Sequence, residues 1–425
     1  MRSKEKGEKR AFREKYAVFC LLSSVFCLVI LFLLARGTPA LAGAGESAPA
    51  DLDRLLANGG VALERDHVLV VARNLDQPLL PASTLKIATA LAALRILGPD
   101  HRFATRFYRN PAGDLFIQGF GDPMLISEEI GAVVGELRQK GLTQVRDIVL
   151  DNSAFALEGQ TPGIGATDNP YDAANCALAV NFNTINIDRA VDGAVRSAEP
   201  QTPTLPLMAE LAAGLQPGNH RLNVTAGAAD PEATSARYAG ELFRAMLIAQ
   251  GIAVAGRIRQ EPVPAGLAEF WTHQSSLKLA EMIPSLLQYS NNFIANQFFL
   301  ACGAGRHGYP ATWAKARQAV NGFFRQEFGF AEDVFFLEEG SGLSRRNRVT
   351  VRAMLDLLAA FRPHAEFLPA ESGRLLKSGT LTGVYAYAGY LRRGDRLDRL
   401  VIILNQEKNT RAAVLLLCEQ LRPSR

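Results

Sequence analysis

Residues 81–86 read Pro81-Ala82-Ser83-Thr84-Leu85-Lys86, and the helix-forming residues that follow predict a helix over residues 83–97. Ser83 and Lys86 are three positions apart, so on a helix their side chains lie one turn apart on the same face. The backbone N–H groups of a helix's first turn have no partner within the helix. Serine is a poor nucleophile alone, and a lysine can act as its base if burial and nearby positive charge keep the amine neutral.

Two later segments supply the groups that such a pair needs. Ser290-Asn291-Asn292 is a Ser-x-Asn sequence, and Lys377-Ser378-Gly379 is a Lys-Ser-Gly sequence. Penicillin-binding proteins and class A β-lactamases carry Ser-x-x-Lys, Ser-Asp-Asn and Lys-Thr-Gly segments in this order. Each segment alone has an ordinary structural explanation, as a solvated helix lysine, a helix cap and a strand end. Together, and in this order, they favour acyl transfer.

Acyl transfer needs a nucleophile, a base and an acid for the leaving group. Ser83 is the expected nucleophile, and Lys86 is the expected base. Ser290 is placed to relay a proton to the leaving amine, while Asn292 would hold both Lys86 and the substrate amide. Lys377 would bind a substrate carboxylate, and its positive charge would lower the pKa of Lys86.

The third segment is also the expected binding edge for the substrate. The hydroxyl of Ser378 would contact the same carboxylate as Lys377. Gly379 lets a substrate backbone lie close to the strand, because it has no side chain. The N–H groups of Ser83 and Thr380 are the expected oxyanion hole.

The first 42 residues predict export. A basic head precedes an apolar run at residues 17–35, and Ala40-Leu41-Ala42 is a cleavage-site pattern. An uncleaved membrane anchor is the alternative, and in either case the rest of the chain is expected in the periplasm, with membrane contact only through this segment. The segment holds eight of the 46 basic and three of the 42 acidic residues, which leaves 38 and 39. The remainder is therefore nearly neutral, and nothing in it indicates binding to nucleic acid.

Cysteine and histidine usage indicates neither a metal site nor a cofactor. Only Cys176, Cys302 and Cys418 lie beyond the apolar run, and they match no metal-ligand spacing. The six histidines are scattered singly. Buried free thiols are expected, and one disulfide among the three remains open.

The alternation of segment types predicts an α+β domain with a long insertion. Helices are expected at residues 51–60, 277–288, 292–302, 311–328, 349–361 and 410–421, and a strand and hairpin at the third segment and at residues 386–405. Residues 101–265 instead read as short strands and turns, with one helix at about 130–141. We expect an antiparallel sheet flanked by helices at 43–100 and 266–425, interrupted by a β-rich accessory domain at 101–265.

At this point the sequence resembles the D-alanyl-D-alanine carboxypeptidases of the class C low-molecular-mass penicillin-binding proteins, the S13 serine peptidase family. Residues 81–86 are similar to that family's first segment in full. Further similar stretches are Gly119-Phe120-Gly121-Asp122-Pro123, Val180-Asn181-Phe182-Asn183 and Gly340-Ser341-Gly342-Leu343-Ser344-Arg345. The likeness extends from about Asp51 to the end, and the long insertion is itself a family trait.

The resemblance implies a penicillin-binding-protein/β-lactamase-like fold and cleavage of the terminal D-Ala-D-Ala of peptidoglycan stem peptides. It also implies an endopeptidase activity on the D-Ala–diaminopimelate cross-link, and acylation of Ser83 by β-lactams. By the same pattern, Asp151, Phe155 and Arg345 would line a pocket for the diaminopimelyl side chain. For Asp151 a turn residue, and for Phe155 a core aromatic, are the structural alternatives.

The sequence departs from the family in its third segment and in one loop. Ser378 stands where threonine is usual, which keeps the hydroxyl. Glu339 stands where aspartate usually precedes Gly340, with an effect on the loop that the sequence leaves open.

Two other functions compete with the carboxypeptidase. A β-lactamase of related fold would need a base that drives hydrolysis of the acyl-enzyme, and no Glu-x-x-x-Asn segment follows Lys86 at a suitable spacing. A non-catalytic cell-wall-binding protein that keeps the fold is the other alternative. The intact serine and lysines argue against it.

Overall fold

The computed structural model describes residues 50–165 and 167–421. The predicted signal peptide or anchor at residues 1–42 lies outside these ranges. Within them, no helix combines the length and the apolar composition that crossing a bilayer requires.

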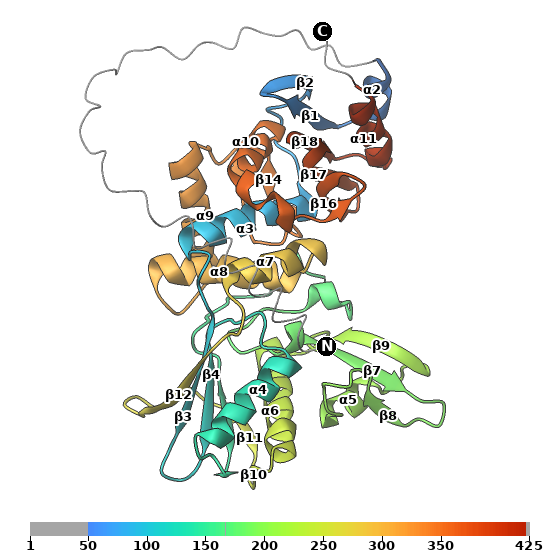
Figure 1. The fold of residues 1–425 in the computed structure, drawn as a ribbon. Helices are drawn as coiled ribbons and strands as arrows, with labels where there is room; N and C mark the ends of the chain where they lie inside the picture. The colour runs from blue at the N-terminus through green and yellow to red at the C-terminus, as the bar shows by residue number, and fades with distance from the viewer. Residues whose placement is uncertain (1–49, 166, 422–425) are drawn as a thin grey trace, which may run out of the picture. The chain divides into compact units, whose positions relative to one another are not determined.

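A six-stranded antiparallel sheet carries the third sequence segment. Its strand order is β15-β16-β17-β18-β1-β2, so the first strands of the chain lie beside the last ones (Figure 1). The strands are β1 (Gly59–Arg65), β2 (Val68–Arg73), β15 (Ala370–Glu371), β16 (Arg374–Leu381), β17 (Val384–Arg393) and β18 (Arg396–Leu404). The predicted strand at residues 377–380 and the hairpin after it are confirmed as β16, β17 and β18.

The helix predicted over residues 51–60 is wrong in its second half. Helix α2 covers only Ala50–Leu55, and the chain then enters β1 at Gly59. A Cβ atom on Gly59 would lie 2.3 Å from the carbonyl oxygen of Ile403 in β18. Gly59 is therefore needed for the close approach between β1 and β18.

Helices cover both faces of the six-stranded sheet, which confirms the α+β fold class. Val61 and Leu63 of β1 pack with α2 and α11 (Arg411–Gln420) on one face. Ala62 of the same strand faces the other side and packs in the larger core. That core contains α3 (Lys86–Ile96), α7 (Leu279–Gln288), α8 (Asn292–His307), α9 (Trp313–Phe328) and α10 (Val351–Phe361).

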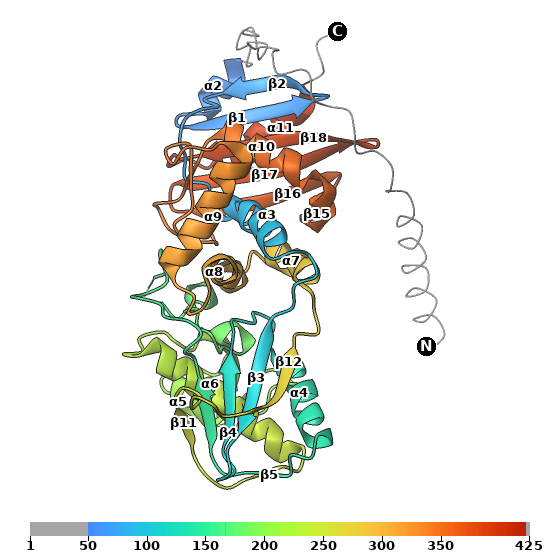
Figure 2. The same cartoon turned by 90° about the vertical axis from the view of Figure 1, so that its left-hand side faces the viewer.

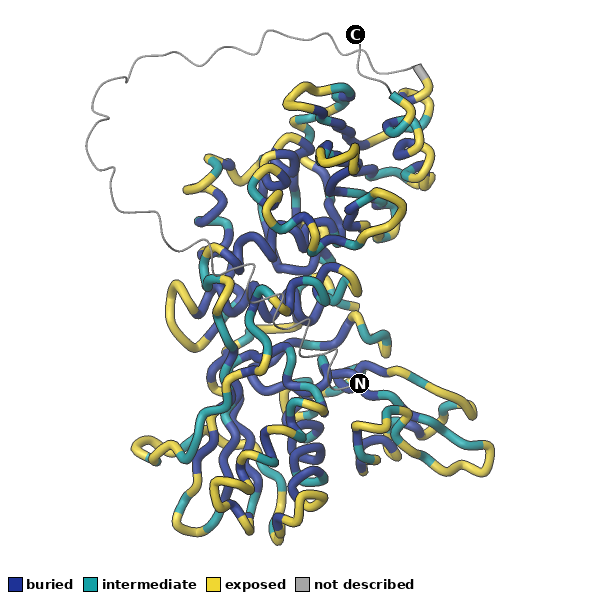
Figure 3. The backbone as a smooth tube through the Cα atoms, in the orientation of Figure 1, coloured by how far each residue is buried: buried dark blue, intermediate teal, exposed yellow. Residues whose placement is uncertain are grey.

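Helix α3 runs through the middle of this core. All residues from Lys86 to Leu94 are buried, and Figure 3 shows the helix in dark blue for most of its length. Apart from Lys86, Thr89 and the exposed Arg95, its residues are apolar or small on every side, as expected of a helix that is enclosed for most of its length. The amine of Lys86 is thus placed inside the domain.

The insertion between α3 and α7 is built on a five-stranded sheet in the order β11-β6-β4-β3-β12 (Figure 2). The pairs β4–β6 and β6–β11 are parallel, and β3 pairs antiparallel with β4 and β12. The strands are β3 (Ala104–Arg109), β4 (Leu115–Gly119), β6 (Ile148–Asp151), β11 (Ile258–Gln260) and β12 (Glu269–Gln274). Helices α4 (Ser127–Gln139) and α6 (Pro231–Ala249) share its apolar core.

Smaller elements complete the described chain. A three-stranded sheet in the order β8-β7-β9 follows the five-stranded sheet in the insertion and is accompanied by helix α5. These elements, with two short strand pairs, are β7 (Thr184–Arg189), β8 (Val195–Ser197), β9 (Gly218–Asn223), α5 (Pro206–Leu211), β5 (Gln144–Val145) with β10 (Ala253–Val254), and β13 (Phe335–Phe336) with β14 (Arg348–Val349).

Two features of the insertion correct the sequence prediction. The boundary predicted between residues 265 and 266 falls inside the insertion, because β12 returns to pair with β3 and the chain leaves that sheet only after Gln274. The insertion is also not simply β-rich, since the long helix α6 was missed. Its start was readable: Pro231 occupies the first turn, and the Asp230 side chain accepts a hydrogen bond from Ala233 N.

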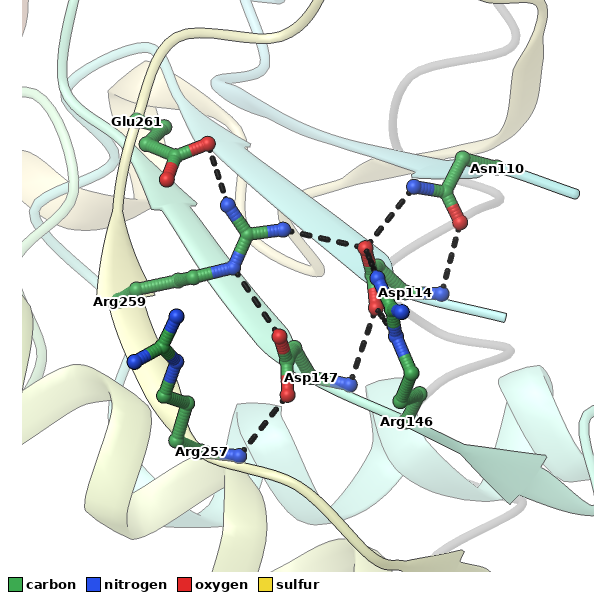
Figure 4. A network of polar contacts seen from close by, with 7 residues as sticks. All are labelled: Asn110, Asp114, Arg146, Asp147, Arg257, Arg259 and Glu261. Atoms are coloured by element: carbon green, nitrogen blue, oxygen red, sulfur yellow. Dashed lines mark hydrogen bonds and ion pairs between the residues drawn. The ribbon is translucent and has the colours of Figure 1, made fainter. Parts of the chain in front are cut away.

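A network of charges fixes one end of the five-stranded sheet (Figure 4). The buried carboxylate of Asp114 accepts hydrogen bonds from Arg146 at 2.5 and 2.6 Å and from Arg259 Nη2 at 3.0 Å. Arg259 also bonds to Asp147 at 3.2 Å. The hydrogen bonds from Arg146 hold the pKa of Asp114 well below its ordinary value. Both oxygens of Asp114 and both oxygens of Asp147 accept hydrogen bonds within the network, so we assign it a structural role.

Candidate active site

Ser83 lies on a tight turn that leads into α3. The 3₁₀ turn η1 (Ala82–Leu85) precedes the helix, and the hydroxyl of Thr84 donates to Pro81 O at 2.7 Å. Two glycines allow other segments to touch this turn. A Cβ on Gly342 would lie 2.0 Å from Ala82 O, and a Cβ on Gly379 would lie 2.9 Å from Ser83 N. The loop after α9 and strand β16 therefore both close around the serine.

The amine of Lys86 joins three segments that are distant in sequence. Lys86 Nζ lies 2.9 Å from Ser83 Oγ, 2.7 Å from Asn292 Oδ1 and 2.6 Å from Ser341 O. The side chain has no exposed surface. The structure thus brings together the first and second sequence segments around one buried amine.

The environment of Lys86 favours its neutral form. Burial lowers the pKa of Lys86 well below its ordinary value, the charge of Lys377 lowers it further, and Glu339 opposes the shift. A neutral amine has two N–H donors and one lone pair. Asn292 Oδ1 and Ser341 O can only accept hydrogen bonds. When Lys86 is neutral and donates to both, its lone pair is left for the hydroxyl hydrogen of Ser83.

Glu339 holds the loop that presents Ser341 O to Lys86. Its buried carboxylate accepts five hydrogen bonds, which no sequence pattern indicated. The donors are Ser341 N at 2.6 Å, Ser341 Oγ at 2.5 Å, Gly342 N at 2.8 Å, Ser344 N at 3.2 Å and Asn347 Nδ2 at 2.7 Å. The glutamate that departs from the family's aspartate is therefore the acceptor around which this loop folds.

In the second segment, the helix cap and the contact to Lys86 are made by two different asparagines. Asn291 is the cap of α8, because its Oδ1 accepts from Ile294 N at 3.0 Å. Asn292, the first residue of the helix, is left to bond Lys86. Ser290 is half-buried with a φ of 53°, and within the described part of the chain its hydroxyl has no hydrogen-bond partner. A strained, unpaired serine beside Asn292 is available to a ligand.

Lys377 is enclosed in β16 on the face toward α3. Its Nζ donates to Ser378 O at 2.8 Å. Burial, with a contribution from the charge of Arg411, lowers the pKa of Lys377 to about 8. Ser378 and Thr380 alternate with it along the strand and are exposed, while Gly379 is packed against the serine turn. The third segment therefore contacts the Ser83 turn through the backbone of Gly379, and the charge of Lys377 lowers the pKa of Lys86.

Arg411 is a neighbour of the third segment that sequence reasoning missed. Its Nη1 donates to Gly379 O at 2.8 Å, Ala386 O at 3.1 Å and Thr380 Oγ1 at 3.2 Å. A single arginine at the start of the last helix has no spacing that relates it to the other segments. Only the folded sheet places it there.

A comparison with protein families identifies the chain. Residues 46–370 match the model of the D-Ala-D-Ala carboxypeptidase 3 (S13) family, which is more than half of the sequence. The chain belongs to the S13 family. It is accordingly a serine-type D-Ala-D-Ala carboxypeptidase, a class of peptidoglycan hydrolase.

Individual relatives agree with the S13 assignment. A D-alanyl-D-alanine carboxypeptidase of an Actinomadura species is 28% identical over 400 residues, covering 75% of this chain and 72% of that protein. The crystal structure of penicillin binding protein 4 (DacB) from Haemophilus influenzae has a TM-score of 0.70 at 22% identity, covering 87% of this chain and 97% of that one. A predatory endopeptidase from Bdellovibrio bacteriovorus, in complex with an immunity protein, has a TM-score of 0.52 at 13% identity, covering 86% and 92%. These structural likenesses support the shared fold.

Two of the three residues carried over from the S13 pattern, Asp151 and Phe155, are buried. Asp151 is buried and its carboxylate is already engaged by Gln118, Ser153 and Val263 at 2.7–2.9 Å. Phe155 is buried in the core, where its ring would lie 2.5 Å from a Cβ on Gly121. Phe155 therefore matches its structural alternative, a core aromatic, whereas Asp151 ends strand β6 and does not lie in a turn. The substrate contacts implied for both residues stay a prediction.

Arg345 is exposed and lies on a different segment. It donates to Thr382 O at 2.7 Å, at the turn that follows β16. Among the described residues, no hydrogen bond or ion pair joins Arg345 to Asp151 or Phe155. The pocket that the resemblance implied for these three side chains is not formed by direct contacts between them.

The insertion of this S13 enzyme contacts the second segment directly, which the sequence did not reveal. Asn292 Nδ2 donates to Tyr171 O at 3.1 Å, so the side chain that holds Lys86 is itself held by the insertion. Asn175 Nδ2 bonds to Phe293 O at 3.0 Å, and Gln297 Nε2 bonds to Cys176 O at 2.9 Å. Helix α8 lies between the two sheets in Figure 2. Its first two turns are therefore a contact between the insertion and the active site.

The cysteines are placed away from any such role. Cys176, Cys302 and Cys418 are buried free thiols. Burial raises the pKa of Cys176 to about 11 and that of Cys418 to about 12. They are unreactive core residues at neutral pH.

Proposed function

We propose that this carboxypeptidase cleaves the terminal D-Ala-D-Ala bond of peptidoglycan stem peptides through an acyl-enzyme on Ser83, and that β-lactams acylate the same serine. The observation that carries the proposal is the position of Lys86 Nζ. It lies 2.9 Å from Ser83 Oγ and 2.6–2.7 Å from two oxygens that can only accept hydrogen bonds. A neutral amine held in this way is oriented as a general base.

In the acylation step, Ser83 Oγ bonds to the carbonyl carbon of the penultimate D-alanine as its proton passes to Lys86 Nζ. The carbonyl oxygen becomes an oxyanion, to which the N–H groups of Ser83 and Thr380 donate hydrogen bonds, each worth about 3 kcal/mol in the transition state. Collapse of this intermediate breaks the C–N bond. Ser290, whose hydroxyl has no hydrogen-bond partner among the described residues, relays the proton from Lys86 Nζ to the departing amine of D-alanine.

Binding of the terminal carboxylate falls to the third segment. The Lys377 amine, with a pKa of about 8, is mostly charged at neutral pH. The exposed hydroxyl of Ser378 follows it on the same strand. Water then replaces D-alanine and hydrolyses the ester on Ser83, which returns the proton-transfer groups to their starting states.

The domain bounds and the cellular location of the protein are also proposals. We propose residues 50–100 and 275–421 as the peptidase domain and residues 101–274 as the inserted domain. Export to the periplasm is proposed from the basic, apolar and small residues of positions 1–42. Cleavage of the D-Ala–diaminopimelate cross-link is a second activity of the same chemistry, and it is supported by the fold shared with the predatory endopeptidase.

Digestion of purified muropeptides by the exported protein tests the proposed function. Pentapeptide monomers are expected to lose one terminal D-alanine, because Ser290 can give a proton to the leaving amine and Lys377 can bind the free carboxylate. Mass spectrometry of the products measures this loss, and cross-linked dimers in the same digest report the endopeptidase activity. Intact pentapeptides after prolonged incubation with folded protein would contradict the carboxypeptidase proposal.

A further inference from the structure

Arg411 connects the last helix to the substrate-binding strand. It is the first residue of α11, and its guanidinium lies 4.2 Å from the centre of the Tyr387 ring. One nitrogen, Nη1, reaches the carbonyl oxygens of Gly379 and Ala386, which face each other in the pairing of β16 with β17. The arginine therefore clamps two strands at a single rung.

This clamp fixes the direction of the neighbouring peptide groups. Because one guanidinium nitrogen reaches both Gly379 O and Ala386 O, the carbonyl of Gly379 points toward β17. Polar groups of successive strand residues point to opposite edges, so the N–H and C=O of Thr380 point to the other edge of β16. Strand β15 pairs only with residues Arg374 and Leu375, which leaves that edge open beside the Ser83 turn.

Arg411 also places a positive charge next to the strand's amine. After burial, the Arg411 charge is the second cause of the lowered pKa of Lys377. Lys377 in turn lowers the pKa of Lys86. Two positive charges, those of Arg411 and Lys377, thus lead from the last helix toward the neutral base beside Ser83.

We propose that Arg411 is a positioning residue of this carboxypeptidase, which aims the Thr380 N–H at the site of the oxyanion and tunes the charge of the Lys377 amine. The proposal rests on the function proposed above for Ser83 and Lys377. It adds a residue that acts through its neighbours and needs no contact with substrate.

The chain offers a matched control. Arg374, at the other end of β16, bonds to Glu419 of α11 at 2.7 and 2.8 Å. Like Arg411, it links this strand to this helix, but it lies on the part of β16 that β15 covers. A loss of helix docking alone should therefore appear equally in Arg374→Gln and Arg411→Gln.

The test measures the second-order rate of acylation by fluorescent penicillin from about pH 6 to about pH 10, with the melting temperature of each variant. The wild type is expected to lose rate on the basic side near pH 8, where Lys377 loses its charge. Arg411→Gln removes a neighbouring positive charge, so the pKa of Lys377 rises. The fall in acylation rate at basic pH, the basic limb of the pH–rate profile, therefore moves to higher pH. The acylation rate of Arg411→Gln at neutral pH is expected to fall about ten- to hundredfold, because the Thr380 N–H is no longer held in the direction of the oxyanion.

Arg411→Lys separates the two effects. It keeps the charge, so the basic limb stays near its wild-type position, but one amine cannot replace the planar clamp and the rate falls as in Arg411→Gln. Arg374→Gln should change neither the limb nor the rate. A basic limb that does not move in Arg411→Gln, with a loss no larger than in Arg374→Gln, would overturn the proposal. Wild-type protein that is folded but never labelled would instead overturn the proposed function.

Discussion

Replacement of Lys86 by methionine is expected to slow acylation of Ser83 by about 10²- to 10⁴-fold, the usual contribution of a general base. The amine is fully buried and is the basic group within hydrogen-bonding distance of Ser83 Oγ. Methionine fills nearly the same space, and it removes the cost of burying an amine, so the fold should persist. Labelling with fluorescent penicillin measures the rate, and thermal unfolding verifies the fold.

Lys315 provides the control for this substitution. Its amine also bonds to two carbonyl oxygens, those of Gly308 and Pro310 at 2.8 Å, but it lies on the exposed start of α9. Lys315→Met should label at the wild-type rate. If folded Lys86→Met protein were acylated within tenfold of the wild-type rate, the role of Lys86 as base would be wrong.

Replacement of Glu339 by alanine is expected to lower the free energy of unfolding by about 3–5 kcal/mol and to reduce acylation as well. Its carboxylate accepts five hydrogen bonds, three of them from backbone N–H groups of the loop. Alanine leaves these donors buried and without an acceptor. The loop would then no longer hold Ser341 O at 2.6 Å from Lys86 Nζ. Denaturant unfolding and penicillin labelling measure the two effects.

The adjacent Glu338 is a control of the same residue type and similar burial. Its carboxylate lies 3.4 Å from Arg317 and 3.6 Å from Arg346, and it accepts no hydrogen bond from the backbone of residues 50–165 or 167–421. Glu338→Ala should therefore cost less stability than Glu339→Ala. Glu339→Asp keeps the charge and shortens the side chain by one methylene, so an intermediate loss is expected. Equal losses in Glu338→Ala and Glu339→Ala would contradict the account of the loop.

The sequence could predict those parts of the site that depend on local spacing. Ser83 and Lys86 lie within one helical turn, so their approach follows from helix geometry once the segment is read as a helix. The order of the three segments added Asn292 and Lys377, because the chemistry requires these groups. The fold class followed from the same match.

What the sequence could not predict depends on contacts between distant segments. Arg411 meets Gly379 only because α11 packs against one face of the sheet, and Tyr171 meets Asn292 only through the folded insertion. Asp151 and Phe155 were carried over from short matches, whereas the burial of Phe155 depends on its packing in the larger core, which holds α3. Helix α6 is different, since its Asp230 cap was visible and was overlooked among the turn residues around it.

The central claim is that Ser83 attacks a carbonyl carbon with the help of the buried Lys86. Intact mass spectrometry of the wild-type protein after incubation with penicillin, followed by peptide mapping, tests it most directly. We predict one added penicillin per chain, located on the peptide that contains Ser83, and no addition to Ser83→Ala protein. A folded wild-type protein that gains no mass, or an adduct that maps to another residue, would contradict the account.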